Sequence, residues 1–176
     1  MITLLTGGVK SGKSRRALDL ALSEWKPSAE KPVFFIATSE IVDDEMKARI
    51  ARHRTERAEL AGEGSFTVIE EPIALDRAVK AAGQRCLVDC LPMWVNNLMY
   101  HKREEDFRSV LEAFIDILVN ENRDCIVVSN ETGLGNVPFD EITRRYNVLL
   151  AEANRKVAAA AGRVELMISG IPLRIK

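Results

Sequence analysis

Short apolar runs alternate with longer amphipathic segments along the whole chain. Each run has a length that suits a strand, and each longer segment repeats its apolar positions at the helical period of about 3.6 residues. We predict strands at residues 2–5, 33–37, 66–69, 86–88, 125–128 and 164–168, and helices at 14–25, 43–60, 73–81, 93–100, 104–122 and 139–161. Strands that alternate with helices indicate an α/β fold, and runs that are apolar almost throughout predict a mostly parallel sheet with helices on both faces.

The last predicted helix carries an apolar stripe along its length, and Gly162 follows it in the position of a helix stop. Because the stripe keeps the helical period, we expect one side of this helix to be buried against the sheet. The stripe consists of Phe139, Ile142, Tyr146, Leu149, Leu150, Ala153, Val157 and Ala160.

The composition is that of an ordinary globular domain. Of the 176 residues, 47% are hydrophobic and 29% are charged, which excludes a disordered chain. No repeat, long linker or shift in composition divides the sequence, so we expect a single domain over residues 1–176. Residues 60–65 have the composition of a flexible connection.

Charge, apolar run length and cysteine usage exclude several classes of partner. Lysine and arginine number 25 against 26 acidic residues, so no overall field attracts the chain to nucleic acid or an anionic membrane. No apolar run approaches the ~20 residues that span a bilayer, and we expect a cytoplasmic protein. Cys86, Cys90 and Cys125 lie in or beside apolar runs and form no CxxC pair, which favours buried thiols.

A phosphate-binding loop follows the first predicted strand. Residues 7–14 match G-x-x-x-x-G-K-[ST] between a strand and a helix, which is the context that gives this pattern its meaning. Glycines let the backbone N–H groups point inward, and the following helix adds its positive end. We expect Lys13 to reach the β- and γ-phosphates and the Ser14 hydroxyl to ligate Mg²⁺. The nucleotide-binding set begins with Gly7, Gly8, Val9, Lys10, Ser11, Gly12, Lys13 and Ser14.

Two later strands end in polar residues. Asp89 follows the run at 86–88 and is our candidate for the second Mg²⁺ ligand, although it could also cap the helix that begins near Pro92. Residues 129–135, SNETGLG, follow the run at 125–128. Open α/β sheets bind ligands at this edge, so the segment is a candidate active-site loop, with an ordinary glycine-rich loop as the alternative.

A histidine lies within an arginine cluster in the helix predicted at 43–60. Helical spacing places Arg49 and Arg57 on the same face as His53, with Arg52 and Arg54 beside it. Guanidinium groups favour the neutral, nucleophilic imidazole and can grip a phosphate. The charge pattern alone is more typical of a solvated basic face than of a catalytic site. His101, beside Lys102, has the sequence surroundings of a surface residue.

With these residues placed, the whole chain resembles the bifunctional adenosylcobinamide kinase/adenosylcobinamide-phosphate guanylyltransferase family of cobalamin biosynthesis. The P-loop is generic, whereas the segment around His53 and the two C-terminal blocks are specific to the family. The matching residues are 6–14, 36–39, 43–46, 50–54, 70–72, 88–91, 94, 97–98, 129–135, 137–138 and 169–176. The chain departs from many relatives at Ala58, in the loop at 62–65, and at Pro92, Val148 and Ala151.

The resemblance implies a RecA-like P-loop NTPase fold, commonly a homotrimer, and two Mg²⁺-dependent reactions. ATP or GTP phosphorylates the aminopropanol hydroxyl of adenosylcobinamide, and GTP then donates GMP through a guanylyl-histidine to the new phosphate. His53 matches the guanylylated histidine, and it is catalytic together with Lys13. Ser14 and Asp89 are the implied metal ligands. The nucleotide-binding set is completed by Arg49, Arg52, Arg54, Glu71, Asn130 and Glu131.

Three other functions remain open at the level of the sequence. A P-loop small-molecule kinase would need Lys13, Ser14 and Asp89 but no histidine nucleophile. A regulatory GTP-binding protein is disfavoured because Asn130 is followed by Glu131 and Thr132 rather than by an N-K-x-D motif. A RecA-like DNA motor is disfavoured by the neutral net charge and by the lack of a basic segment interleaved with aromatic residues.

Overall fold

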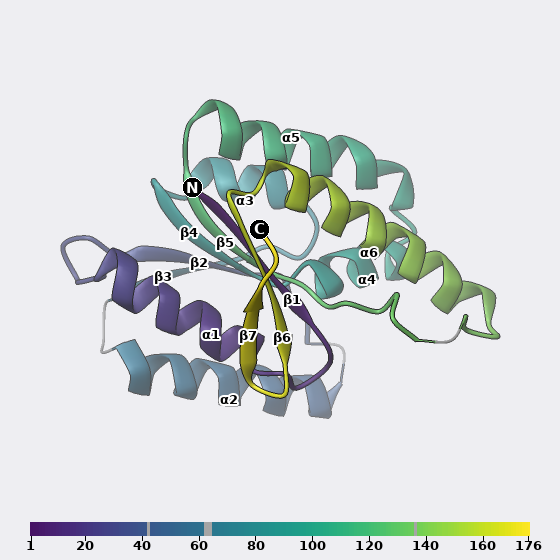
Figure 1. The fold of residues 1–176 in the computed structure, drawn as a ribbon, viewed down its shortest axis with the longest axis horizontal. Coiled ribbons are helices and arrows are strands. Elements are labelled where there is room, and N and C mark those ends of the chain that lie inside the picture. Colours follow the sequence, from purple (N-terminus) through teal and green to yellow (C-terminus); the bar gives the residue numbers. More distant parts are fainter. Residues whose placement is uncertain (42, 62–64, 136) are drawn as a thin grey trace.

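One mixed sheet runs through the computed structural model, which describes residues 1–41, 43–61, 65–135 and 137–176, apart from the side chains of Arg49 and Ala61. Among the described residues the sheet has seven strands in the order β3-β2-β4-β5-β1-β6-β7 (Figure 1). The first six strands are parallel, and β7 runs antiparallel to β6. The strands are β1 (Ile2–Gly7), β2 (Val33–Ala37), β3 (Phe66–Glu70), β4 (Arg85–Asp89), β5 (Asp124–Val128), β6 (Arg163–Ile168) and β7 (Ile171–Arg174).

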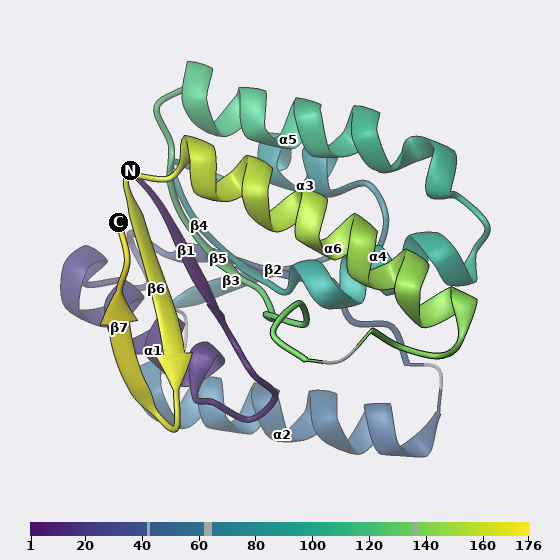
Figure 2. The same cartoon turned by 45° about the vertical axis from the view of Figure 1, so that its right-hand side comes forward.

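Helices cover both faces of the sheet, as the sequence predicts (Figures 1 and 2). One face carries α1 (Lys13–Leu20), its π-helical continuation η1 (Ala21–Trp25) and α2 (Asp44–Ala61). Leu5, Leu87 and Ile126 from three strands pack there against Ala17 and Leu18 of α1. The other face carries α3 (Leu75–Ala81), α4 (Leu91–Tyr100), η2 (Glu104–Asp106), α5 (Phe107–Asn120) and α6 (Glu141–Ala160).

The core on this second face is the larger of the two. Trp94 of α4 and Phe107 of α5 are fully buried and stacked, with ring centroids 5.4 Å apart. Leu4, Val88 and Val127 meet them from the sheet. Because strands in the middle of the sheet have helices on both sides, their side chains are buried whichever way they point, which explains their nearly continuous apolar sequence.

Strand β7 is absent from the sequence-based prediction, which ends its last strand at residue 168. The structure turns at Ser169 and Gly170, both with positive φ (51° and 84°), and pairs Ile171 with Ile168. All four residues of β7 are exposed. Three of its residues, Ile171, Pro172 and Leu173, are apolar, but the run is short and contains a proline, which strands tolerate mainly at a sheet edge.

The predicted apolar stripe at residues 139–161 is wrong at its beginning. Phe139 precedes α6 and is fully exposed (101%), and Ile142 in its first turn is 73% exposed. The helix begins after Asp140, whose carboxylate accepts the Thr143 amide, and this end of α6 extends beyond the sheet (Figure 1). Burial against the core starts at Tyr146 and continues through Leu149, Leu150, Ala153 and Val157.

The cysteine prediction holds for two of the three thiols. Cys86 and Cys125 are fully buried on neighbouring strands, and burial raises the pKa of the Cys125 thiol, with Cys86 adding to the effect. Cys90 is half-buried at the start of α4. Half of the predicted flexible connection at 60–65, namely residues 62–64, lies outside the described residues. Within the described chain, none of the helices has the length and apolar character that crossing a membrane requires.

Candidate active site

The P-loop connects β1 to α1 and curls around the Lys13 ammonium. Lys13 Nζ donates to the Gly8 carbonyl at 2.5 Å and contacts Ser11 Oγ at 3.4 Å. Gly7 has φ 142°, and a Cβ there would lie 2.4 Å from the Met167 carbonyl oxygen, so this position requires glycine. Gly12 is the N-cap of α1, with φ 91°. The loop thus leads directly into the N-terminus of α1, the end of a helix that favours anions.

The β6–β7 hairpin supports the P-loop from outside the motif. The Gly170 amide donates to the Ser11 carbonyl at 3.2 Å. Arg16, one turn into α1, makes a two-pronged ion pair with buried Glu165 of β6, at 2.9 and 3.1 Å. Hydrogen bonding to Glu165 raises the pKa of Arg16. The hairpin and α1 therefore hold the loop together.

Asp89 is the last residue of β4, and a polar network fixes the chain directly after it. The Thr38 hydroxyl accepts from the Cys90 amide (2.8 Å) and donates to the Cys90 carbonyl (2.7 Å), while the Thr38 amide donates to Asp89 O (3.2 Å). Asn97 of α4 donates its side-chain amide to Thr38 O (2.6 Å) and Pro72 O (3.2 Å). The N-cap of α4 is Cys90, the residue directly after Asp89.

Helix α2 supplies the basic wall of the site. Arg57 is buried, with its guanidinium carbon 4.1 Å from the centroid of the Phe35 ring. Burial lowers the pKa of Arg57 and the positive Arg54 adds to this, whereas Asp89 and Glu70 act in the opposite direction. Arg54 forms an ion pair with Glu70 at the end of β3. The basic cluster is therefore partly folded into the protein, unlike a fully solvated face.

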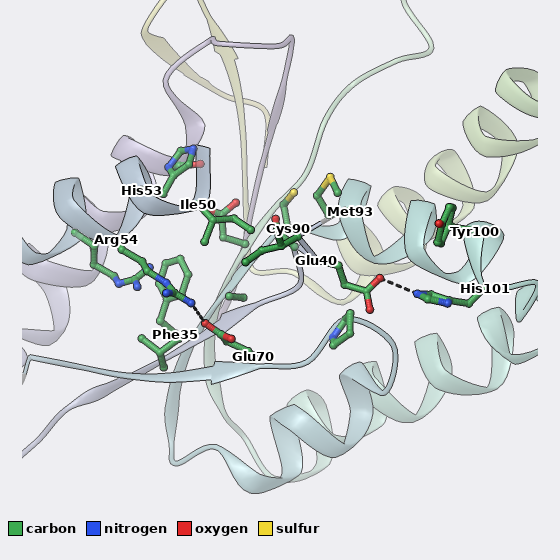
Figure 3. A pocket seen from close by; sticks show the side chains of 18 residues that line it. Phe35, Glu40, Ile50, His53, Arg54, Glu70, Cys90, Met93, Tyr100 and His101 are labelled. Carbon is green, nitrogen blue, oxygen red and sulfur yellow. Dashed lines mark hydrogen bonds and ion pairs between the residues drawn. The ribbon is translucent and has the colours of Figure 1, made fainter. Parts of the chain in front are cut away.

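His53 shares a cavity with the P-loop serine and with Asp89. A cavity of about 670 Å³ opens along the carboxyl ends of β2 and β4, and a second of about 250 Å³ adjoins it (Figure 3). His53 Nδ1 lies 3.6 Å from Glu56 Oε2 in the next turn of α2. The residues that line both cavities are Ser14, Phe35, His53, Arg57 and Asp89. Four of the five are residues that the sequence singles out, and they come from three separate segments.

Other predicted site residues lie elsewhere. Arg52 is exposed outside the described lining of both cavities, and the side chain of Arg49 lies outside the described part of the chain. Glu71 accepts the amides of Ile73 (2.9 Å) and Ala74 (2.8 Å) with one oxygen, and its neighbour Glu70 lines the larger cavity instead.

The loop after β5 lies beside the P-loop. The Glu131 amide donates to the Gly7 carbonyl (3.0 Å), which joins the two loops directly. Asn154 of α6 donates to Asn130 O (2.8 Å) and accepts from Ser129 Oγ (2.6 Å). Asn130 and Glu131 are not among the described residues that line the two cavities, so their nucleotide-binding role stays a prediction.

The oxygen donors at the site suit a hard divalent cation. Within the described chain, no group of three or more histidine, cysteine or acidic side chains is arranged to hold a metal. The Ser14 hydroxyl and the Asp89 carboxylate instead face shared cavities, as expected for Mg²⁺ that takes its other ligands from phosphate oxygens and water.

The sequence does not predict what several residues near the site do. Thr38 and Asn97 lie in segments that match the family, but their hydrogen bonds to backbone atoms of distant segments are visible only in the structure. Glu40 and His101 line the larger cavity and pair at 2.7 Å (Figure 3). His101 is exposed, as the sequence predicts, but its surface is the cavity wall.

The fold is that of RecA-like P-loop ATPases. A KaiC-like protein from Pyrococcus horikoshii superposes with a TM-score of 0.53 at 22% identity, covering 94% of this chain and 69% of that one. The flagellar accessory protein FlaH from Methanocaldococcus jannaschii gives a TM-score of 0.52 at 9% identity, covering 99% of this chain and 77% of that one. At such identities the likeness concerns the fold alone.

Sequence similarity to characterised enzymes covers the full chain. The bifunctional adenosylcobalamin biosynthesis protein CobP of Pseudomonas aeruginosa is 36% identical over 100% of this chain and 98% of its own length. The corresponding protein CobU of Escherichia coli is 33% identical, with both chains covered completely. The model of the cobinamide kinase / cobinamide phosphate guanyltransferase family matches residues 3–175. On this match, and with the P-loop and His53 facing one cavity, the chain belongs to the cobinamide kinase / cobinamide phosphate guanyltransferase family.

Proposed function

We propose that this chain carries out both family reactions in one domain, residues 1–176. It phosphorylates the aminopropanol hydroxyl of adenosylcobinamide with ATP or GTP, and it then transfers GMP from GTP through His53 to give adenosyl-GDP-cobinamide. The observation that carries the proposal is that Ser14, Asp89 and His53 line the same two cavities. A kinase site alone requires the first two residues but gives no reason for an imidazole beside them.

In the kinase step, the hydroxyl oxygen of the acceptor attacks the γ-phosphorus, the bond from that phosphorus to the bridging oxygen breaks, and a nucleoside diphosphate leaves. The hydroxyl proton passes to solvent. Lys13 and the inward N–H groups of the P-loop stabilise negative charge on the phosphates. Mg²⁺, held by Ser14 and Asp89, would neutralise charge on the phosphate oxygens.

In the transfer step, a ring nitrogen of neutral His53 attacks the α-phosphorus of GTP and pyrophosphate leaves. A phosphate oxygen of the acceptor then attacks the same phosphorus, the P–N bond breaks, and the imidazole is restored. The buried Arg57 guanidinium lies on the same cavity wall as His53 and offsets the charge of the triphosphate. Exposed Glu56 places a carboxylate oxygen 3.6 Å from His53 Nδ1.

The test combines two labels on the purified protein. With Mg²⁺ and α-labelled GTP, we expect one guanylyl group per chain, mapped to His53 by peptide mass and joined by an acid-labile, base-stable bond. With γ-labelled ATP, we expect label on adenosylcobinamide. A labelled corrinoid without a guanylylated protein would favour the P-loop kinase alternative, and a protein that labels neither would contradict both reactions.

We also propose that the enzyme assembles as a homotrimer, as the family resemblance implies. Exposed apolar side chains support self-association, because burying them against another subunit is favourable. The segment between β5 and α6 and the first turn of α6 expose Leu134, Val137, Phe139 and Ile142. Light scattering of the purified protein gives the assembly mass directly, and a monomer mass at micromolar concentration would contradict the trimer.

A further inference from the structure

The larger cavity has two chemically different ends. The end at the P-loop is marked by Ser14, His53, Arg57 and Asp89, which also line the smaller cavity. The opposite part, here called the distal end, is lined by residues of the larger cavity alone. The distal end is formed by Glu40, Ile41, Met93, Tyr100 and His101, from the segment after β2 and from α4 with the residue that follows it.

The distal end does not suit a phosphate chain. Glu40 places a carboxylate there, and Ile41 and Met93 contribute apolar surface. A triphosphate held at the P-loop would meet a like charge if it extended this way, so the electrostatics favour a ligand that is not anionic. A ligand with apolar surface and hydrogen-bond donors matches this wall, because a carboxylate only accepts hydrogen bonds.

Glu40 and His101 are arranged to contact such a ligand. Their side chains pair at 2.7 Å and keep 28% and 40% of their surface exposed. A half-exposed contact between a carboxylate and an imidazole contributes little to folding, so stability gives little reason for this one. Tyr100 packs its ring edge-on against His101, with centroids 5.1 Å apart. The three side chains form one polar and aromatic surface at the far side of the cavity from His53 (Figure 3).

We propose that the distal end is the acceptor subsite, where Glu40, His101 and Tyr100 bind the edge of the corrinoid while its hydroxyl arm reaches toward Ser14 and Asp89. This inference rests on the proposed function. The primary amides at the edge of a corrinoid are uncharged hydrogen-bond donors, and the carboxylate of Glu40 accepts them. The pairing with His101 holds that carboxylate in place, and the Tyr100 ring supplies apolar contact.

The test separates recognition of the acceptor from recognition of the nucleotide. Glu40→Gln and His101→Gln are compared with wild type for the KM of adenosylcobinamide, the KM of ATP and guanylylation by GTP. Loss of a hydrogen bond to a charged group costs about 1.5–3 kcal/mol, so we expect the KM of adenosylcobinamide to rise about tenfold or more. The KM of ATP and the labelling rate should stay within about twofold of wild type. Glu112→Gln, which breaks an exposed ion pair with Lys156 between α5 and α6, is the matched control.

Three outcomes decide the inference. An adenosylcobinamide KM that is unchanged in both variants, with an active wild type, overturns the acceptor subsite and leaves the proposed function intact. A raised KM for ATP, or slowed labelling with an unchanged adenosylcobinamide KM, assigns the distal end to the nucleotide and also overturns it. A folded wild type that phosphorylates no corrinoid contradicts the proposed function itself. Thermal melting of each variant confirms that the comparison concerns folded protein.

Discussion

The Thr38 hydroxyl forms hydrogen bonds with both backbone groups of Cys90, accepting from its amide at 2.8 Å and donating to its carbonyl at 2.7 Å. Thr38 is completely buried, so no water replaces these bonds when the hydroxyl is lost. Because Cys90 directly follows Asp89, the same contact restrains the carboxylate proposed to hold Mg²⁺.

We expect Thr38→Val to lower the free energy of unfolding by roughly 1–3 kcal/mol and to raise the Mg²⁺ concentration that gives half-maximal activity. Valine keeps the shape of threonine but leaves the Cys90 amide and carbonyl without their partner. Thr38→Ser keeps the hydroxyl and serves as the control. Denaturant melts and Mg²⁺ titrations that are the same for both variants would show that the hydroxyl positions nothing.

Asp89→Asn tests the metal assignment more directly. Removing the negative charge while keeping the shape should raise the half-saturating Mg²⁺ concentration about tenfold or more, with partial recovery at high Mg²⁺. Asp116→Asn, at an exposed position on α5, provides the comparison. A titration curve for Asp89→Asn that overlays that of wild type would remove Asp89 from the metal site.

Lys13→Ala should lose about a hundredfold or more of nucleotide-dependent activity while its melting temperature changes little. The ammonium contacts Gly8 O and Ser11 Oγ within the loop, so it contributes charge at the phosphate site and little to the core. Lys80→Ala, an exposed lysine of α3, controls for loss of a positive charge. Unchanged turnover in Lys13→Ala would refute the P-loop assignment.

His53→Asn should abolish covalent labelling by GTP and leave part of the kinase activity, because only the transfer step requires an imidazole. Replacing Arg57 should slow labelling, and Arg57→Glu should slow it more than Arg57→Ala, since the carboxylate repels the triphosphate. Arg77→Glu on α3 is the charge control. Label on His53→Asn, detected by intact mass, would remove His53 as the nucleophile.

Gly7→Ala should destabilise the protein strongly, whereas Gly8→Ala should leave its melting temperature nearly unchanged. The first adds a Cβ 2.4 Å from the Met167 carbonyl at a φ of 142°, and the second adds one into open space. Thermal melts of the two variants check this contrast. Equal melting temperatures would mean that β6 can move away from the loop at little cost.

The sequence predicts most of the fold and the phosphate-binding loop of the site, because both depend on local patterns. The apolar runs predict six of the strands, and the P-loop motif predicts the cradle around Lys13. The exposure of Phe139 could not be predicted, since it depends on how far α6 extends beyond the sheet. The cavity role of His101 likewise depends on Glu40, which comes from a distant segment. Long-range packing decides such positions, and a local pattern does not contain it.

The contact from Gly170 to Ser11 joins the P-loop to a hairpin far along the sequence. More than 140 residues separate the nucleotide-binding motif from β6 and β7. The loop and the first turn of α1 nevertheless contact Met167, Glu165 and Gly170. A chain that lacks β6 and β7 would carry the complete motif without the strands that shape its loop. We therefore expect such a truncated chain to bind nucleotide poorly although every residue of the motif is present.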